Sequence, residues 1–391
     1  MAADLPLSVL IVNYNTAALT RRCVVSLRAQ RMRSAEDSMS PLEIIVVDNA
    51  SRAEERNALS GLDATVVYND SNRGYGAALN QAARIARGES LLFSNSDTWY
   101  FPNALQALSD AMRVLPRCGA VGPRLWWDDD RAFLLPPSDP VTPVRYLLDT
   151  AARAGSWFHH PMARWWRRRA LRHWTRQDSV AQPMLSGASL FTTKRVLVDC
   201  GGFDEQFRLY YEDTDWCRRV RRKGYHLYHV PGAEVAHFYN QSGRQNVMEA
   251  QHLGRESEAR YFQKHYGSWV WSALSRMVAR WCGPDVHAAA SRDYVDLGAR
   301  SDPPHFPCST REVSNALWQI SPLPSCLPAI ARFVRAPEDL VLPSQVWAHL
   351  GPGDFFARLF ALPDLRVVQQ WRWRKVAAES QNEQDIHASR E

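Results

Sequence analysis

The sequence lacks the marks of a secreted, membrane-spanning or zinc-cluster protein. No two of its seven cysteines form a C-x-x-C pair, which argues against a zinc cluster. Their odd number and wide spacing fit a reducing compartment better than a disulfide framework. They are Cys23, Cys118, Cys200, Cys217, Cys282, Cys308 and Cys326. No run reaches the ~18 apolar residues of a membrane span, and the N-terminus has no basic start before a long apolar stretch. We expect a cytoplasmic protein, either soluble or peripheral to a membrane.

Two phosphate-binding loops are also missing. The segment IVNYNTAAL, which follows the first apolar run, contains no G-x-G-x-x-G, so a dinucleotide-binding oxidoreductase is not indicated. It also lacks the glycine-rich loop with Arg or Lys that a nucleotidyltransferase would place there. The net charge of +6 comes with no recognised nucleic-acid-binding motif, and we expect no nucleic-acid partner.

What is present is a chain of ordinary globular composition and alternating local pattern. Its 391 residues, 46% of them hydrophobic, are enough for two domains or for one large domain with an extension. Apolar, β-branched runs alternate with helical patterns in the first ~125 residues. The expected strands are 7–12, 42–48, 64–68, 90–97 and 118–127, and the expected helices are 16–30, 75–87 and 102–115. This order predicts an α/β fold with a mainly parallel sheet and helices on both faces.

Polar clusters follow the expected strands. Asn13 and Asn15 end the first strand, Asp48 ends the second, residues 69–74 follow the third, and residues 95–97 end the fourth. Parallel sheets of this kind bind ligands at the carboxyl ends of their strands. Any single cluster is also explained by turn formation, because Asn and Asp favour turns. All four together predict a binding site at one edge of the sheet.

The remainder of the chain is less regular. Residues 130–180 look irregular, and within them 157–174 mixes Trp with Arg in a way that suits an anionic membrane surface, or alternatively packs between domains. Further on we expect a helix at 212–223, strands at 225–230 and 233–238, and a helix at 255–282. Residues 283–391 are rich in proline and end in a polar tail. We expect residues 251–391 to form a mainly helical extension.

Eight strings, in this order, resemble a family 2 glycosyltransferase with the GT-A fold, and in particular the bacterial rhamnosyltransferase-like members. They are SVLIVNYN (8–15), IIVVDNAS (44–51), NRGYGAALN (72–80), FSNSD (93–97), SGASLF (186–191), GGFDEQF (201–207), YYEDTDWCRR (210–219) and AHFYNQSG (236–243). The resemblance covers residues 7–240, about 60% of the chain. It implies a catalytic domain over 1–250, with nucleotide-sugar binding in 1–125 and an acceptor-side part in 180–250.

The resemblance implies a donor site in the first half of this domain. Asp48 would accept a hydrogen bond from the imide N–H of uracil or thymine, although an Asx turn with Asn49 and Ser51 also explains it. Arg73 and Gly74 precede a helix whose N-terminus favours an anion, and plain capping is the alternative. The implied donor-binding residues are Asn13, Asn15, Asp48, Asn72, Arg73, Gly74 and Asn95.

A divalent cation, Mg²⁺ or Mn²⁺, is implied as cofactor. The family's D-x-D motif reads Asn95-Ser96-Asp97 here, with an amide in place of the first acid. Asp97 is the implied metal ligand, and a helix cap before Pro102 is its alternative role. His237 stands where metal-dependent relatives complete the site, although a histidine at a strand end is more often simply hydrogen-bonded.

The acceptor side is implied by the acids of YYEDTDW. Asp213 corresponds to the catalytic base and Glu212 to an acceptor-binding residue; favourable interaction with the helix dipole also explains such acids at a helix start. Trp216 either stacks on a sugar or fills the core. Gly187, in SGASLF, is also carried over as acceptor-binding.

Together these roles imply an inverting transfer of rhamnose or another hexose from a dTDP- or UDP-sugar to a glycan or lipid-linked glycan, in cell-wall or polysaccharide synthesis. Peripheral contact with the inner membrane face would bring the enzyme to a lipid-linked acceptor. The alternatives left open are a nucleotide-sugar-binding protein without turnover and a nucleotidyltransferase. Donor hydrolysis or transfer separates the first of these from an enzyme, whereas donor binding does not.

Overall fold

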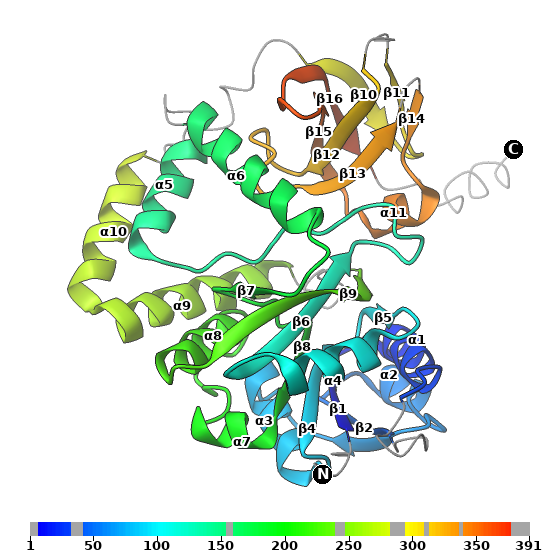
Figure 1. The fold of residues 1–391 in the computed structure, drawn as a ribbon, viewed down its shortest axis with the longest axis vertical. Coiled ribbons are helices and arrows are strands. Elements are labelled where there is room, and N and C mark those ends of the chain that lie inside the picture. The colour runs from blue at the N-terminus through cyan, green and yellow to red at the C-terminus, as the bar shows by residue number, and fades with distance from the viewer. Residues whose placement is uncertain are drawn as a thin grey trace, which may run out of the picture. The chain divides into compact units, whose positions relative to one another are not determined.

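The computed structural model describes residues 7–32, 42–153, 159–238, 247–281, 294–308, 313–335 and 339–376. Trp157 and the polar tail beyond residue 376 therefore lie outside the described residues. The chain forms two compact units, Met1–Val286 and His287–Glu391 (Figure 1). The boundary lies after residue 286, whereas the sequence suggested residue 250. The difference arises because two further helices, within residues 247–281, belong to the first unit.

The first unit is built around one nine-stranded sheet. Its strands are β1 Leu7–Asn13, β2 Leu42–Asp48, β3 Thr65–Tyr68, β4 Ser90–Asn95, β5 Thr98–Tyr100, β6 Cys118–Trp126, β7 Val180–Gln182, β8 Ser189–Thr193 and β9 His226–His237. The order is β3-β2-β1-β4-β8-β6-β9-β5, with β7 beside β9. The neighbours from β3 to β4 are parallel, β6 and β9 are parallel, and β8 runs antiparallel to both β4 and β6.

The parallel strands are apolar on both faces because helices cover both. In β1, Leu10 and Val12 pack in one core cluster, while Val9 and Ile11 pack in the other. The first cluster includes side chains of α3 Tyr75–Ile85 and α8 Glu212–Arg222. The second includes side chains of α1 Ala17–Arg28 and α4 Ala104–Val114. The shorter helices of the sheet connections are α2 Ala53–Ala58 and α7 Lys194–Asp199. The predicted α/β class is confirmed.

Four more helices form a separate part of the first unit (Figure 1). They are α5 Pro143–Arg153, α6 His159–Trp174, α9 Val247–Tyr266 and α10 Ser268–Trp281. The prediction that 130–180 is irregular is wrong for α5 and α6; in α6 the many arginines hid a helical spacing of buried residues. The helix expected at 255–282 is two helices, separated at Gly267, whose φ is +93°. None of the described helices is both long enough and apolar enough to cross a membrane.

The second unit consists mainly of strands. Its elements are β10 Val295–Arg300, β11 His305–Pro307, β12 Asn315–Ser321, β13 Ile330–Arg335, β14 Asp339–Val341, α11 Ser344–His349, β15 Gly353–Ala361 and β16 Val367–Lys375. Five strands form a sheet in the order β10-β16-β15-β12-β13, and β11 pairs with β14. The expectation of a mainly helical extension is therefore wrong for this unit. In β16, buried Trp371 and Trp373 alternate with exposed Arg372 and Arg374, which is the two-residue period of a strand.

Candidate active site

The carboxyl ends of the parallel strands meet beside a pocket of about 480 Å³. In the pairing of β1 with β2, Asn13 stands opposite Asp48, and β4 ends nearby at Asn95. The polar ends therefore share one edge of the sheet, as the sequence predicts. Seven predicted site residues line the pocket: Asn72, Asn95, Asp97, Gly187, Glu212, Asp213 and His237. Asp97 and Asp213, separated by more than a hundred residues, are thus brought to one cavity.

Asn13 and Asp48 lie behind the pocket wall and are both fully buried. The Asn13 amide donates to Asp48 Oδ1 at 2.8 Å and to Ser51 Oγ at 3.0 Å. Asp48 Oδ2 accepts from Arg56 Nε at 2.9 Å and from the Ser51 backbone N–H at 3.2 Å. These contacts order the loop after β2. Contact of either residue with the donor stays a prediction, as it does for Asn15, whose Oδ1 accepts from the Arg52 backbone N–H.

A network of amides shapes the loop before α3. The Asn49 side chain donates to Asn72 Oδ1 at 2.8 Å and accepts from the Arg73 backbone N–H at 3.0 Å. Gly74 has φ +89°, and a Cβ there would lie 3.0 Å from the Arg208 carbonyl oxygen. Glycine is needed for both reasons. Asn49 lines the pocket, whereas Arg73 does not.

Arg208 is the cation that lines this part of the pocket. Its guanidinium lies 3.4 Å from the Asn72 carbonyl oxygen, and its own carbonyl accepts from the Tyr75 N–H at the start of α3. The sequence places this arginine between the GGFDE and YYED strings, and that position is the signal that was missed. Arg73, the predicted phosphate contact, instead lies near Gln81 Oε1 at 3.5 Å.

Asn95, Asp97 and His237 form a compact group where β4 turns into β5. His237 Nε2 lies 3.3 Å from Asp97 Oδ1 and 3.1 Å from Asn95 Nδ2. The antiparallel pairing of Thr98 with His237 brings β5 and β9 together, and the Phe238 N–H donates to the Asp97 carbonyl at 3.0 Å. Asn95 and Asp97 share the pocket through a turn, where an extended segment had been expected.

One carboxylate and one imidazole suit a divalent cation that takes its other ligands from substrate phosphates. Within the described ranges, no group of three or more His, Cys, Asp or Glu side chains is placed to hold a metal ion. Asp97 and His237 are both largely buried and open into the pocket, so their chemistry fits such a shared site.

Asp213 is held by donors on two sides. The Gly187 N–H donates to Asp213 Oδ2 at 2.9 Å, and the Thr214 N–H donates to Oδ1 at 2.6 Å. A Cβ added to Gly187 would lie 2.9 Å from both Cβ and Oδ2 of Asp213. Glycine at position 187 therefore allows the backbone to approach this carboxylate closely. The resemblance implied a contact with the acceptor for Gly187, and that contact stays a prediction.

Glu212 and Asp213 carry perturbed acidities. Burial, and then the charge of Asp213, raise the pKa of Glu212 to about 8. Burial also raises the pKa of Asp213, and the hydrogen bonds from Gly187 and Thr214 oppose that rise. Glu212 Oε2 has no hydrogen-bond partner among the described residues although Glu212 lines the pocket. A buried carboxyl oxygen without a donor among these residues agrees with the raised pKa, because no hydrogen bond from them stabilises the charge on that oxygen.

Tyr75 stands between the two groups of acids. Its hydroxyl donates to Asn95 Oδ1 at 2.6 Å. Burial raises the phenol pKa well above its ordinary value, and the charges of Glu212, Asp213 and Asp97 raise it further. Tyr75 therefore stays neutral and acts as a hydrogen-bond donor. It lies within the NRGYG string, yet the sequence interpretation assigned it no role.

The start of α8 is fixed from behind by Asp215. This buried carboxylate lies 2.7 Å from Arg219 Nε, 2.7 Å from Lys264 Nζ and 2.8 Å from His265 Nε2. Burial alone would raise its pKa, but the hydrogen bond from His265 and the charges of Arg219 and Lys264 hold it far below the ordinary value. The contacts tie α8 to α9, and so hold Asp213 in place.

The prediction that Trp216 contacts the acceptor is wrong. Its side chain is fully buried and packs against Phe93 and Phe203, with ring centres 6.4 and 5.8 Å away. One helical turn after Asp213, the chain faces the sheet, and a fully enclosed ring cannot touch substrate. The core alternative is the correct one.

Two successive tyrosines immediately before α8 have left-handed backbone conformations. Tyr210 has φ +63° and Tyr211 has φ +69°, and both line the pocket. Such values are uncommon outside glycine and persist only where surrounding contacts hold them. The Tyr211 hydroxyl donates to Glu258 Oε1 at 2.9 Å on α9, which supplies such a contact. Glu212 and Asp213, which follow this pair directly, line the same pocket.

Comparison with known proteins gives a family for the first part of the chain. Residues 8–175 match the sequence model of Glycosyl transferase family 2. Residues 8–175 form a family 2 glycosyltransferase domain. This glycosyltransferase is 26% identical over 284 residues to the N-acetylglucosaminyl-diphospho-decaprenol L-rhamnosyltransferase of Mycobacterium tuberculosis, covering 67% of this chain and 86% of that protein. It is also 34% identical over 102 residues to the putative glycosyltransferase EpsH of Bacillus subtilis, covering 25% of this chain and 27% of that one.

Solved structures that match part of the chain include the mannosyltransferase PcManGT from Pyrobaculum calidifontis in complex with GDP-Man and Mn²⁺. The TM-score is 0.43 at 19% identity, over 73% of this chain and 79% of that chain. GalNAc-T7 with UDP, GalNAc and Mn²⁺ gives the same TM-score at 14% identity, over 80% of this chain and 62% of that chain.

Proposed function

We propose that this glycosyltransferase moves rhamnose or another hexose from a dTDP- or UDP-sugar to a hydroxyl of a lipid-linked glycan, with inversion at the anomeric carbon. One observation carries the proposal: Asp213, held by the Gly187 N–H, lines the same pocket as Asp97 and His237. One carboxylate thus faces the acceptor side, while a separate acid and imidazole face the donor side.

In this proposal Asp213 takes the proton of the acceptor hydroxyl as its oxygen attacks the anomeric carbon. The bond from that carbon to the diphosphate oxygen breaks on the opposite face of the sugar, so no covalent sugar–enzyme intermediate is formed. The raised pKa of Asp213 makes it a stronger base than an ordinary carboxylate. Glu212, which lines the pocket beside Asp213, binds a second hydroxyl of the acceptor.

The donor diphosphate lies, in this proposal, between Arg208 and the Asp97–His237 pair. Asp97 and His237 would hold a divalent cation, which neutralises charge on the departing diphosphate. Arg208 contributes a charge-assisted hydrogen bond to the same group, since it lines the pocket beside the Asn72 loop. Tyr75 holds Asn95 through its hydroxyl, so that the amide stays beside His237.

The acceptor class is inferred from the relative in Mycobacterium tuberculosis, whose name specifies a diphospho-decaprenol carrier. We place the same chemical class here, a sugar linked through a diphosphate to a polyprenol. Such a carrier is anchored in a membrane, so we also place the enzyme peripherally on the inner membrane face. Helix α9 contributes the apolar Ala250 and Leu253 to the wall of the same pocket, together with Glu249.

The test is a panel of dTDP- and UDP-sugars, assayed with Mn²⁺ and polyprenyl-diphosphate-linked N-acetylglucosamine as acceptor. We expect transfer from one donor class, with an inverted anomeric configuration in the product. Asp213→Asn is expected to keep donor affinity and lose transfer by a thousandfold or more. Asp178→Asn, which changes an exposed acid of the loop between α6 and β7, is the matched control. Transfer by Asp213→Asn at the wild-type rate would refute the assignment of the base.

A further inference from the structure

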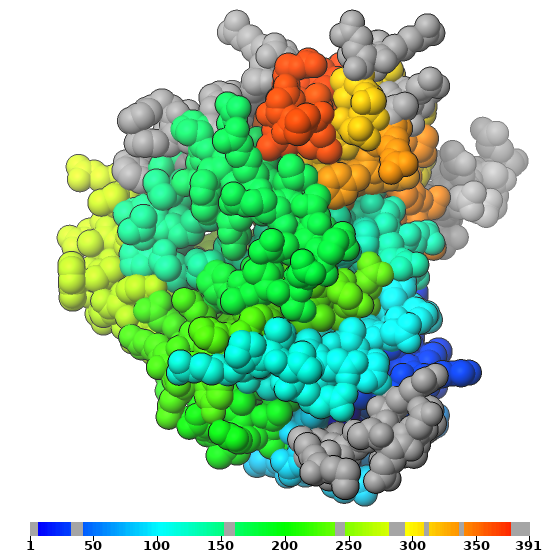
Figure 2. Space-filling model, viewed as in Figure 1, coloured from blue at the N-terminus to red at the C-terminus, as the bar shows by residue number. Residues whose placement is uncertain are grey.

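A second surface of the first unit is formed by α6, α5 and α10. Helix α5 packs against both α6 and α10, so the three helices form one layer (Figure 1). Helix α6 forms part of the molecular surface facing the viewer in Figure 2. We infer that this layer binds the surface of an anionic phospholipid membrane through α6 and α10. The inference rests on the proposed function, because a polyprenol-linked acceptor resides in such a membrane and the enzyme must reach it there.

Helix α6 has two distinct faces. Its buried face carries Ala163, Trp166, Ala170 and Trp174. The Trp166 and Trp174 rings pack edge to face with centres 6.2 Å apart, and Trp174 Nε1 donates to the Leu135 carbonyl at 2.8 Å. These two tryptophans therefore hold α6 in the fold and do not serve a membrane.

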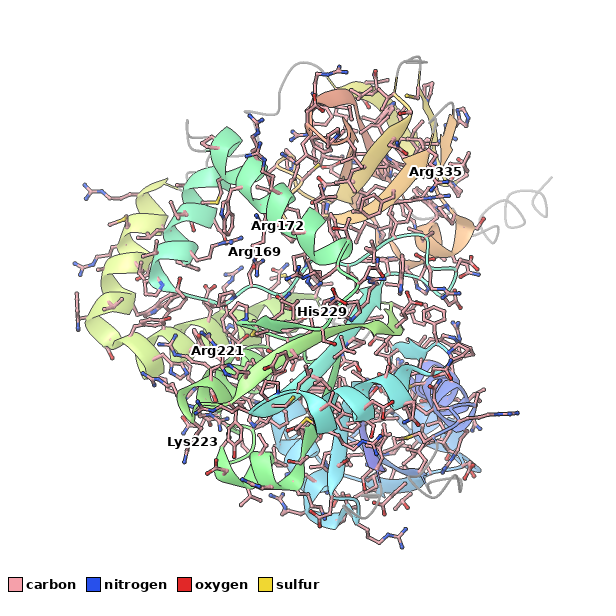
Figure 3. All side chains as sticks on the ribbon, in the orientation of Figure 1. Arg169, Arg172, Arg221, Lys223, His229 and Arg335 are labelled. Carbon is pink, nitrogen blue, oxygen red and sulfur yellow. The ribbon has the colours of Figure 1, made fainter. Side chains whose placement is uncertain are left out.

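The opposite face of α6 is basic. Arg164, Arg168 and Arg172 are exposed and stand four residues apart, so they form one stripe along the helix. Figure 3 shows Arg172 on this helix together with Arg169, whose guanidinium pairs with Asp139. Within the described ranges the three stripe arginines have no ion-pair partner, unlike Arg169. A stripe of unpaired cations contributes nothing to the fold through ion pairs.

Exposed apolar side chains accompany this stripe. Trp165 on α6 is 48% exposed, and the Arg145 guanidinium of α5 lies over its ring at 5.1 Å. On α10, Trp269 is 77% exposed and Met277 is 39% exposed. Arg276 and Arg280 are exposed on the same face of α10, because the spacings from Trp269 are seven and eleven residues.

Arginine beside exposed Trp is the composition of a membrane interface. Trp rings sit at the level of lipid headgroups, and arginines pair with lipid phosphates. Nucleic acid would use the same charge, but α6 and α10 also present the exposed apolar side chains of Trp165, Trp269 and Met277, which fit the acyl boundary of a bilayer. Anionic lipid is therefore the partner that both the charge and the apolar side chains favour.

The surface is connected to the active site through the chain itself. Val141 lines the pocket two residues before α5 begins. Leu253 of α9 also lines it, and α9 packs against α10. The loop before α5 and helix α9, which adjoin the helices of the proposed membrane face, thus supply part of the pocket wall.

The experiment is flotation of the full chain with vesicles of phosphatidylcholine containing 30% phosphatidylglycerol, and with pure phosphatidylcholine vesicles, without donor or acceptor. The test variant is Arg164→Gln/Arg168→Gln/Arg172→Gln. The control variant removes three exposed arginines that have no side-chain partner among the described residues, on elements of the sheet connections: Arg31→Gln/Arg52→Gln/Arg195→Gln. Both variants lower the net charge equally, so that only position differs.

We expect wild type and control to float with the anionic vesicles, and less so at high salt. Each basic residue near such a surface contributes about 1 kcal/mol, so the test variant should lose partitioning by on the order of a hundredfold. Its unfolding midpoint should match that of the control, since the stripe makes no ion pairs.

Equal flotation of the two variants, or no flotation of wild type with anionic vesicles, would overturn the inference. Binding of wild type to duplex DNA without any flotation would also overturn it. None of these readouts involves sugar transfer. Failure of the membrane inference is therefore distinguishable from failure of the proposed function, which the Asp213→Asn assay tests separately.

Discussion

Replacement of Gly187 by alanine tests how the catalytic carboxylate is held. The Gly187 N–H donates to Asp213 Oδ2 at 2.9 Å, so the backbone here touches the proposed base directly. In Gly187→Ala the added Cβ would lie 2.9 Å from Asp213 Cβ and Oδ2 and 3.2 Å from Cγ. The crowded atoms belong to the short side chain of Asp213, which has no long flexible end that could move away.

The size of the effect follows from these distances. Carbon atoms in contact prefer separations of about 3.5–4.0 Å, so the carboxylate must retreat by roughly 0.5–1 Å. A misplacement of about 1 Å at a reacting group lowers a rate by roughly a hundredfold. We therefore expect kcat to fall about 10- to 100-fold, while donor affinity changes little. Overpacking of this kind also costs about 1–3 kcal/mol of stability.

Two glycine controls separate crowding of the base from general effects. Gly232→Ala in β9 adds a Cβ that meets nothing within 4 Å, and it should leave both rate and stability unchanged. Gly122→Ala crowds Leu185 at 3.1 Å, so it should lower the unfolding midpoint without a matching loss of kcat. Steady-state kinetics, donor titration and thermal unfolding of the three variants decide the matter. A Gly187→Ala enzyme with wild-type kcat would refute the positioning of the base by this backbone.

Three further predictions concern the same pocket. Arg208→Ala should weaken binding of the nucleoside diphosphate about 10- to 100-fold, because one charge-assisted hydrogen bond is lost, whereas Arg73→Ala should change this affinity little. Titration calorimetry compares the two variants, and a larger loss for Arg73→Ala would contradict the pocket assignment. Since burial raises the pKa of Asp213 and the base must be ionised, kcat/KM should rise with pH through a midpoint above the ordinary aspartate value of about 4, and a limb at or below that value would count against Asp213. Asp97→Asn should raise the Mn²⁺ concentration for half-maximal activity by about tenfold or more, and an unchanged Mn²⁺ dependence would remove Asp97 from the cation site.

The secondary structure around the site was largely predictable from the sequence. Buried parallel strands are continuous apolar runs, so β1, β2 and β4 were recognisable at nearly their observed bounds. The amide and acid residues that end them were therefore predictable at the sheet edge. The EDTD string likewise marked the start of α8 by its three acids, and Asp213 lines the pocket as expected.

Other elements were not predictable because their patterns were masked. In α6 the buried Ala163, Trp166, Ala170 and Trp174 follow a helical spacing, but the intervening arginines lower its mean hydropathy and hide it. In the second unit prolines lie between the strands, and in β16 the buried tryptophans stand beside exposed arginines. An alternating Trp and Arg pattern in β16 was therefore read as part of a helical extension.

By itself, the sequence determined the α/β class, the sheet edge that carries the polar residues, and the pairing of Asp213 with a helix start, since each depends on local pattern. Only the tertiary structure decided which side chains share the pocket. In that structure Trp216 is buried, Arg208 rather than Arg73 lines the pocket, and Gly187 contacts Asp213. These outcomes depend on contacts between segments far apart in the chain, whose side-chain directions are set by packing rather than by local sequence.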